Sequence, residues 1–260
     1  MTQQAQIKTT YIDHMGTDLS TVNAARVSYD KKSFGETIEY DIFHDDPDTI
    51  KASVAKYKAE GWVVTSDVDA WKIIISRPLV GDARLIKFLA KHKHTSPFNH
   101  AFASFHIKAP IYVARQLVKH EYLPWNEVSG RYVVFKGEFY TPEQFRMAAA
   151  DKKQGSGEDA ETKLNAKFTG IFTDGQMSAL RDYEYCIKMG MAEEQARARL
   201  PLDLMTQWYW SGSLGAFAKM CNLRCKEDTQ YESRLVADQV STIMQDLYPV
   251  SWDSLMELEI

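Results

Sequence analysis

In the first half of the chain, apolar residues recur every three or four positions in the segments 15–30, 45–62 and 81–92. This spacing gathers them on one face of an amphipathic helix, so each segment is predicted to be helical. Asp18 or Ser20 is expected to cap the first of these helices, because a short polar side chain can accept from the free N–H groups at a helix start.

The second helix is expected to have Asp48 as its N-cap and to stop at Gly61. Two runs rich in β-branched and aromatic residues follow at 62–66 and 70–76. Runs of this kind joined by a short polar link are typical of a β-hairpin.

Residues 100–109 alternate between apolar and polar positions, which predicts a strand with Ala103, Phe105 and Ile107 on one face. Pro110 suits the first position of a helix over 110–120. That helix would carry Gln116, Lys119 and His120 along one face. Residues 130–135 are again strand-like.

The polar, glycine-bearing segment 151–161 predicts a loop. Beyond it, the helical period is present in 172–191, 192–200, 205–220 and 231–249. Aromatic residues are abundant on both sides of the loop, so a single domain over 1–260 with one core is expected. The mixture of helices and strands gives an α+β fold class.

The composition of the chain disfavours a nucleic-acid-binding function. The chain has 260 residues, a formal net charge of −4 and 25% charged residues, so binding of nucleic acid through bulk charge is disfavoured. Its six tryptophans and thirteen tyrosines could stack bases, but without a basic stripe they are better explained as core residues.

The three cysteines, Cys186, Cys221 and Cys225, form no C-x-x-C pair, and their odd number argues against a disulfide framework. The first fifteen residues lack the apolar core of a signal peptide, and no apolar run approaches the ~20 residues that span a bilayer. We therefore expect a cytoplasmic protein with no membrane partner.

The segment KHEYLPWNEVSGRY, residues 119–132, is dense in hydrogen-bonding side chains. Arg131 offers a planar fork suited to a phosphate or carboxylate, and Gly130 allows close approach of a ligand to the backbone. Glu127 could pair with Arg131 or accept from a ring N–H. An equally simple interpretation is a structural loop held by that Glu–Arg pair.

Other clusters are weaker. The segment 92–100 holds three of the seven histidines, but its spacing fits no metal site, so no metal is expected. Arg197 and Arg199, before the helix break at Pro201, hint at a phosphate site only weakly, and Arg224 does the same. The cysteines beside Arg224 are expected to be core residues.

Residues 119–132 resemble the signature of the flavin-dependent thymidylate synthases, R-H-R-x-x-S-x-N-E-x-S-x-R-Y. Six signature residues are in register: His120, Asn126, Glu127, Ser129, Arg131 and Tyr132. Five further segments resemble family segments in family order: GTDLSTVNAARVSYD, RLIKFLAKHKHTSPFNH, FHIKAPIYVARQLVKH, ARARLPLDLMTQWYW and NLR. The resemblance covers most of the chain outside about 31–80 and 140–190.

The resemblance implies an enzyme that converts dUMP to dTMP. The one-carbon donor would be methylenetetrahydrofolate, and the reducing hydride would come from FAD, itself reduced by NADPH. It also implies a homotetramer with sites at subunit interfaces and no cysteine nucleophile. The partners would thus be small molecules.

The resemblance also assigns residues. The positions matching the family's nucleotide site are Gln116, Glu127, Ser129, Gly130, Arg131, Arg197 and Arg224. On the flavin side Ser28, His94, Ser96 and His120 match the family. Five further residues stand at positions of the FAD site but differ from the usual family residue: Asn99, Lys119, Glu121, Ser213 and Lys219. Within these sets, Arg224, Arg131 and His94 would serve the chemistry.

The departures from the family lie on the flavin side. Lys119 and Glu121 replace signature arginines, and Pro124 replaces the signature serine. Residues 40–78 are interpreted as an inserted helix and hairpin, a divergence that resembles virus-borne members acting in a host cytosol. Two alternatives stay open: a flavin enzyme placing another group, such as hydroxymethyl, on C5 or acting on a cytidine nucleotide, and an inactive nucleotide-binding homologue.

Overall fold

The computed structural model describes residues 5–60, 62–67, 71–149 and 155–257. The chain divides into two compact units that are interleaved along the sequence. Unit 1 comprises Met1–Tyr11, Phe105–Trp210 and Leu223–Gln239. Unit 2 comprises Ile12–Ser104, Ser211–Asn222 and Val240–Ile260.

A four-stranded sheet has the order β1-β5-β7-β6. Its strands are β1 (Lys8–Met15), β5 (Phe102–Pro110), β6 (Trp125–Glu127) and β7 (Met205–Ser213). In β5 the side chains of Ala103, Phe105 and Ile107 are buried, which confirms the predicted alternation. β6 runs antiparallel to β7, with Glu127 opposite Trp208.

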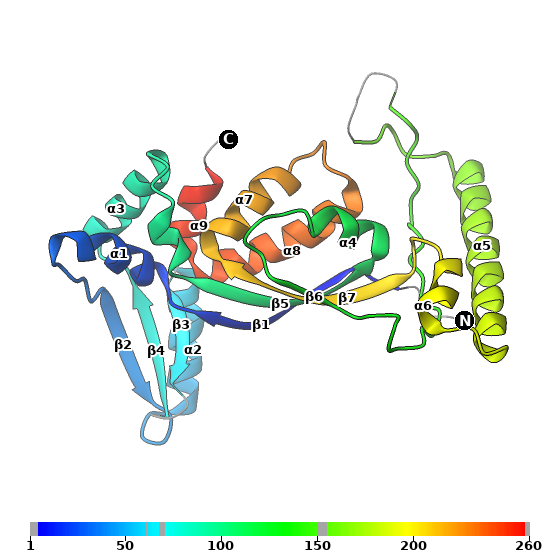
Figure 1. Ribbon diagram of the computed structural model, residues 1–260. Helices are drawn as coiled ribbons and strands as arrows, with labels where there is room; N and C mark the ends of the chain where they lie inside the picture. Colours follow the sequence, from blue (N-terminus) through cyan, green and yellow to red (C-terminus); the bar gives the residue numbers. More distant parts are fainter. Residues whose placement is uncertain (1–4, 61, 68–70, 150–154, 258–260) are drawn as a thin grey trace. The chain divides into compact units, whose positions relative to one another are not determined.

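A second sheet lies within unit 2 and has the order β2-β4-β3. Its strands are β2 (Glu36–Asp41), β3 (Val63–Asp67) and β4 (Lys72–Arg77), and both pairings are antiparallel. The helix α2 (Pro47–Ala59) lies beside β3 (Figure 1). The predicted helix and hairpin are therefore present, with β2 as an additional strand.

The other helices of unit 2 include α1 (Asp18–Arg26), α3 (Val80–Lys91) and α9 (Pro249–Met256), which pack on one another (Figure 1). Unit 1 holds α4 (Ile111–Leu117), α5 (Thr162–Lys188) and α6 (Glu193–Ala196), with α5 against α6. The helices α7 (Leu214–Arg224) and α8 (Tyr231–Leu247) each have residues in both units. Short 3₁₀ turns cover Val27–Tyr29, Ser96–Asn99 and Arg197–Arg199.

Several predicted helix ends were wrong. Thr17 caps α1 by accepting from Leu19 N, and Asp46 caps α2 by accepting from Thr49 N, with Pro47 as the first helical residue. In both cases a short polar residue closer to the N-terminus captures the free N–H groups first. Gly61, the predicted stop, lies outside the described residues.

Two segment types were also wrong. Residues 205–213 form strand β7 rather than helix, and 130–135 form turns rather than a strand. The helix α4 ends at Leu117, so Lys119 and His120 follow it in a turn instead of continuing its face. Of the loop predicted over 151–161, residues 151–154 lie outside the described residues. Residues 155–161 contain no helix or strand, as predicted, and α5 begins directly after them.

Asp18 joins the two ends of unit 2. Its carboxyl oxygens accept from Val250 N at 3.0 Å and Ser251 N at 2.8 Å, the free N–H groups at the start of α9. Burial raises the pKa of Asp18, although the hydrogen bonds from Ser251 and Val250 oppose that rise. The carboxyl group therefore stabilises the fold most when it is protonated.

This sets a pH dependence. Because the pKa of Asp18 is raised in the folded protein, its contribution to stability is fully present below the pKa of the unfolded chain, 3.8. That contribution is lost as the pH rises through the pKa of the folded state. The free energy of unfolding should therefore fall as the pH rises above the unfolded value, and Asp18→Asn should flatten that fall. Urea titrations at a series of pH values measure it, with exposed Asp246→Asn as the control. An unchanged slope in Asp18→Asn would contradict this account.

Across the described residues, no helix is both long and apolar enough to cross a membrane.

Candidate functional site: the loop after α4

The loop that follows α4 is anchored to the sheet by aromatic stacking. Trp125, in β6, lies nearly parallel to Trp208, with ring centroids 4.3 Å apart and an angle of 17°. Trp208 is fully buried in β7. The stack thus fixes the strand that carries Glu127, and it leaves the residues after β6 to form an exposed turn.

Glu127 is held by two donors. Its Oε1 accepts from Thr206 Oγ1 at 2.7 Å, and its Oε2 accepts from Trp125 Nε1 at 3.1 Å. Among the described residues, Glu127 forms no ion pair with Arg131. The structural Glu–Arg pair considered from the sequence is therefore wrong, because Thr206 and Trp125 occupy the carboxylate instead.

The turn after β6 brings Ser129, Gly130 and Arg131 together. Ser129 Oγ accepts from the backbone N–H of Arg131 at 3.3 Å and from its Nε at 3.5 Å. A Cβ at Gly130 would meet the ring of Phe135 and lie 3.2 Å from Arg197 Cδ. Only glycine fits there without displacing the ring. The turn therefore places the predicted residues Gly130 and Arg197 side by side.

Arg224, at the end of α7, meets the signature histidine. Its Nε donates to His120 Nε2 at 3.0 Å, so that ring nitrogen carries no proton. Burial lowers the pKa of the Arg224 guanidinium. No other hydrogen bond from this side chain occurs among the described residues, so its terminal amino groups are available to an anionic or carbonyl ligand.

Gln116 and Arg197 complete the predicted nucleotide set. Gln116 Nε2 donates to Gln230 Oε1 at 3.3 Å, while its Oε1 is buried and accepts from no protein group in the described structure. Arg197 is exposed and donates from Nε to the carbonyl of Glu194 at 3.3 Å. All seven predicted nucleotide residues lie in unit 1.

The predicted FAD residues are divided. Lys119, His120 and Glu121 follow α4 in unit 1, and the other six lie in unit 2. Within unit 2, Ser213 Oγ donates to Asn99 Oδ1 at 2.7 Å and accepts from Ala216 N at 3.2 Å. A Cβ at Gly215 would lie 3.1 Å from Asn99 Oδ1, so the helix start carries a tight polar cluster.

The remaining flavin-side residues of unit 2 are more exposed. His94 lies roughly parallel to Phe88, with centroids 6.2 Å apart and an angle of 19°. Ser28, Ser96 and Lys219 are exposed as well, Lys219 from α7 itself.

Within the parts of the chain that are described, no three His, Cys, Asp or Glu side chains gather as a metal site would require. The three cysteines are free. Cys221 is fully buried, as expected of a core residue, whereas Cys225 is only partly buried.

Sequence reasoning missed the residues that hold the site in place. Thr206 and Trp208 fall in a segment predicted to be helical, although the alternation of buried Thr206, Trp208 and Trp210 with exposed Gln207 and Tyr209 is that of a strand. Gln230 gave no signal, because a single amide between two helices has no characteristic spacing.

Comparison with known proteins shows which family has this fold and this loop. A family model described as thymidylate synthase complementing protein, Thy1, matches residues 10–250. The chain therefore belongs to this family, which confirms the resemblance drawn from residues 119–132.

Two curated relatives are informative. A flavin-dependent thymidylate synthase of Thermus thermophilus is 39% identical over 176 residues, which are 68% of this chain and 64% of the relative. The chain thus matches slightly less than two thirds of that protein's length. The flavin-dependent thymidylate synthase of Wolbachia pipientis wMel is 30% identical over 248 residues, 95% of this chain and 72% of the relative.

A solved structure shares the fold. A UMP/dUMP methylase of Streptomyces cacaoi, bound with 5-Br dUMP, superposes with a TM-score of 0.72 at 24% identity. The superposition covers 96% of this chain and 95% of that one, which confirms the α+β fold class.

Proposed function

We propose that this protein is a flavin-dependent thymidylate synthase. It would convert dUMP to dTMP with methylenetetrahydrofolate as one-carbon donor and FAD, reduced by NADPH, as reductant. The observation that carries the proposal is the turn after β6, which holds Glu127, Ser129 and Arg131 together and places Gly130 beside Arg197, in a family whose relatives bear this name.

The donors of unit 1 suit a nucleoside monophosphate. Arg131 and Arg197 are exposed guanidinium groups, and a guanidinium binds a phosphate through paired charge-assisted hydrogen bonds. Arg224 is half-buried, so its charge is less screened by water. We assign the phosphate to the exposed pair and the pyrimidine ring to Arg224, which would stabilise negative charge developing on the ring.

The cluster at the start of α7 suits a flavin nucleotide. The N-terminus of a helix attracts the charge of a pyrophosphate, and Ser213, Asn99 and Lys219 add a hydroxyl, an amide and a cation. FAD bound there would supply the hydride that reduces the transferred carbon. Lys119, His120 and Glu121 form the other predicted flavin segment.

Tritium release tests the reaction. The protein, with dUMP tritiated at C5, methylenetetrahydrofolate, FAD and NADPH, should release tritium to water and yield dTMP. Release without dTMP would indicate another C5 product, such as a hydroxymethyl nucleotide. Calorimetric binding of dUMP without any release would indicate the inactive homologue.

Assembly and compartment are further parts of the proposal. We infer a homotetramer with active sites at subunit interfaces, which light scattering on the purified protein would measure. A cytosolic location, that of a host cell for a virus-borne member, accords with the three free cysteines.

The cysteines should be dispensable for the chemistry. A variant with Cys186, Cys221 and Cys225 all changed to serine should retain turnover, since the hydride chemistry needs no thiolate. Because Cys221 is fully buried, Cys221→Ala serves as the milder variant if the triple variant loses stability. Loss of tritium release in a variant that is folded and binds dUMP would count against the proposed mechanism.

A further inference from the structure

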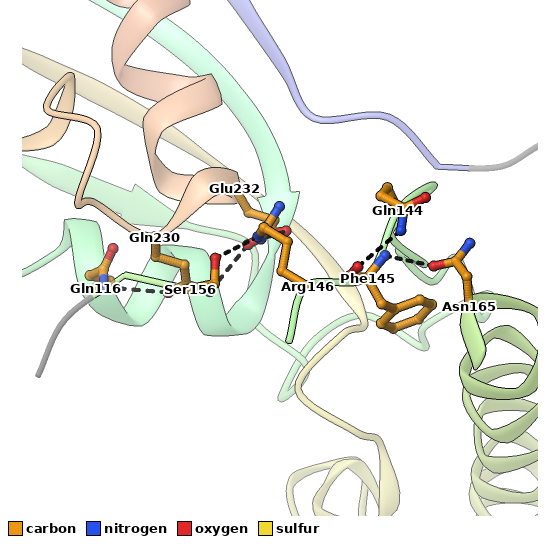
Figure 2. A network of polar contacts seen from close by, with 8 residues as sticks. All are labelled: Gln116, Gln144, Phe145, Arg146, Ser156, Asn165, Gln230 and Glu232. Atoms are coloured by element: carbon orange, nitrogen blue, oxygen red, sulfur yellow. Dashed lines mark hydrogen bonds and ion pairs between the residues drawn. The ribbon is translucent and has the colours of Figure 1, made fainter. Parts of the chain in front are cut away.

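Gln116 is the end of a directional chain of hydrogen bonds in unit 1. Its Nε2 donates to Gln230 Oε1 at 3.3 Å, and Gln230 Nε2 donates to Glu232 Oε2 at 3.4 Å. The other carboxylate oxygen of Glu232 accepts from Arg146 Nη2 at 2.7 Å. Figure 2 shows these side chains converging from α4, the start of α8 and the segment before α5.

The far end of this chain is fixed. Glu232 is only 3% exposed and lies in the first turn of α8. Arg146 is held by three contacts: the ion pair with Glu232, a hydrogen bond from its Nε to Ser156 Oγ at 2.8 Å, and a position 4.6 Å from the ring centre of Tyr231. A buried carboxylate with such a partner has little freedom to turn.

The chemistry of the carboxylate sets the direction of the two amides. An ionised carboxylate can only accept, so the amide NH₂ of Gln230 must face Glu232. Its carbonyl oxygen then faces Gln116 and can accept only from the NH₂ of that amide. Gln116 therefore directs its own carbonyl oxygen away from Gln230, and this oxygen is the buried atom without a protein donor.

In the described protein this buried acceptor has no donor, and a donor supplied by the ligand would satisfy it. A fully ionised phosphate has no proton to give. The deoxyribose 3′-hydroxyl is a donor that dUMP and dCMP share, so it would give no preference between them. On the bases, uracil carries a proton on N3, whereas cytosine has a lone pair there and donates only from its exocyclic amino group.

We propose that Gln230 and Glu232 are positioning residues that lock the amide of Gln116, so that its carbonyl oxygen accepts from N3–H of uracil and selects uracil over cytosine nucleotides. The inference rests on the proposed function, since it takes the pyrimidine nucleotide as the ligand of Gln116.

The test is the ratio of the dissociation constants for dCMP and dUMP, measured by calorimetry without FAD or folate. Wild type should favour dUMP by about tenfold or more, the effect expected when a buried acceptor loses its donor. N3-methyl-dUMP should bind as poorly as dCMP. In Gln230→Met the amide of Gln116 can turn over, so the ratio should approach one.

A charge-conserving exchange provides the positive control. In the double variant Gln230→Glu with Glu232→Gln, the carboxylate at position 230 accepts from Gln116 and from the new amide at 232. The orientation of Gln116 is then preserved, and the ratio should return to within about threefold of wild type. Gln144→Met is the matched control. Gln144 donates to Phe145 O and Ala160 O and takes no part in the hydrogen bonds that link Gln116 to Arg146 (Figure 2), so its loss should leave the ratio unchanged.

The outcomes separate this inference from the proposed function. If wild type binds neither nucleotide, the proposed function fails. If wild type binds dUMP but shows no preference over dCMP, or if Gln230→Met keeps the full preference, the positioning role is overturned. If Gln230→Met weakens the binding of both nucleotides equally, its ratio of dissociation constants stays at the wild-type value. That result would indicate a purely structural effect and would likewise overturn the positioning role.

Discussion

Replacing Arg224 with alanine is expected to weaken dUMP binding by roughly ten- to a hundredfold, equivalent to about 1.5–3 kcal/mol. The guanidinium is half-buried, and among the described residues its one hydrogen bond runs from Nε to His120, so its terminal amino groups can bind the ligand. In a chain of net charge −4, no bulk positive charge compensates for its loss. Calorimetric titration of dUMP measures the change.

Arg199→Ala is the matched control for that substitution. Arg199 is exposed and pairs with Asp182 at 2.8 Å, so its loss removes the same charge from the chain without removing a proposed ligand. Its dissociation constant for dUMP should stay within about twofold of wild type. Equal weakening in both variants would mean that net charge, rather than the Arg224 contact, governs binding.

Replacing Trp208 with alanine is expected to lower the free energy of unfolding by about 3–5 kcal/mol, the usual cost of emptying a buried tryptophan site. Trp208 is 1% exposed, and the ring of Trp125 stacks on it at 4.3 Å. The loss therefore removes both a core side chain and the support of β6. Urea unfolding followed by circular dichroism measures the change.

Trp252→Ala separates stability from function. Trp252, in α9 of unit 2, is also 1% exposed, and its loss should cost a similar free energy. Of the two alanine variants, only Trp208→Ala should weaken dUMP binding, because the ring of Trp125 that stacks on Trp208 belongs to the same strand as Glu127. Trp208→Phe keeps an aromatic partner and should bind dUMP nearly as wild type does. Equal weakening by Trp252→Ala would refute the specific role of the stack.

The sequence predicted most helices but fewer of the strands around the site. Helical periodicity is a local signal, so α3 and α8 were predicted close to their observed ranges, whereas α5 begins at Thr162, ten residues before the predicted start at 172. Strand β6 has three residues and exists because β7 pairs with it, and β7 itself carries tryptophans in a segment predicted to be helical. Pairing between distant segments leaves little trace in either segment alone.

In the candidate site, too, features set by neighbouring residues were predicted and features set by distant segments were not. The motif placed Glu127, Ser129, Gly130 and Arg131 in one turn because they are neighbours in the chain. Of the two partners considered for Glu127, Arg131 was wrong, since Thr206 is a better-placed donor from a strand 79 residues away. The other, a ring N–H, is present as the indole N–H of Trp125. Side-chain partners of this kind depend on the tertiary fold, which residue spacing does not encode.

The carboxyl group of Asp18 joins residues that are 233 positions apart, since it caps the start of α9. During synthesis the chain emerges from the ribosome N-terminus first. Asp18, in α1, is therefore made long before the N–H groups of α9 that its carboxyl group caps. Unit 2 can close only after Ser251 has left the ribosome. The nascent protein must therefore hold a buried carboxyl site open while all the intervening residues are made, and a chain released before Ser251 would leave that carboxyl without its donors.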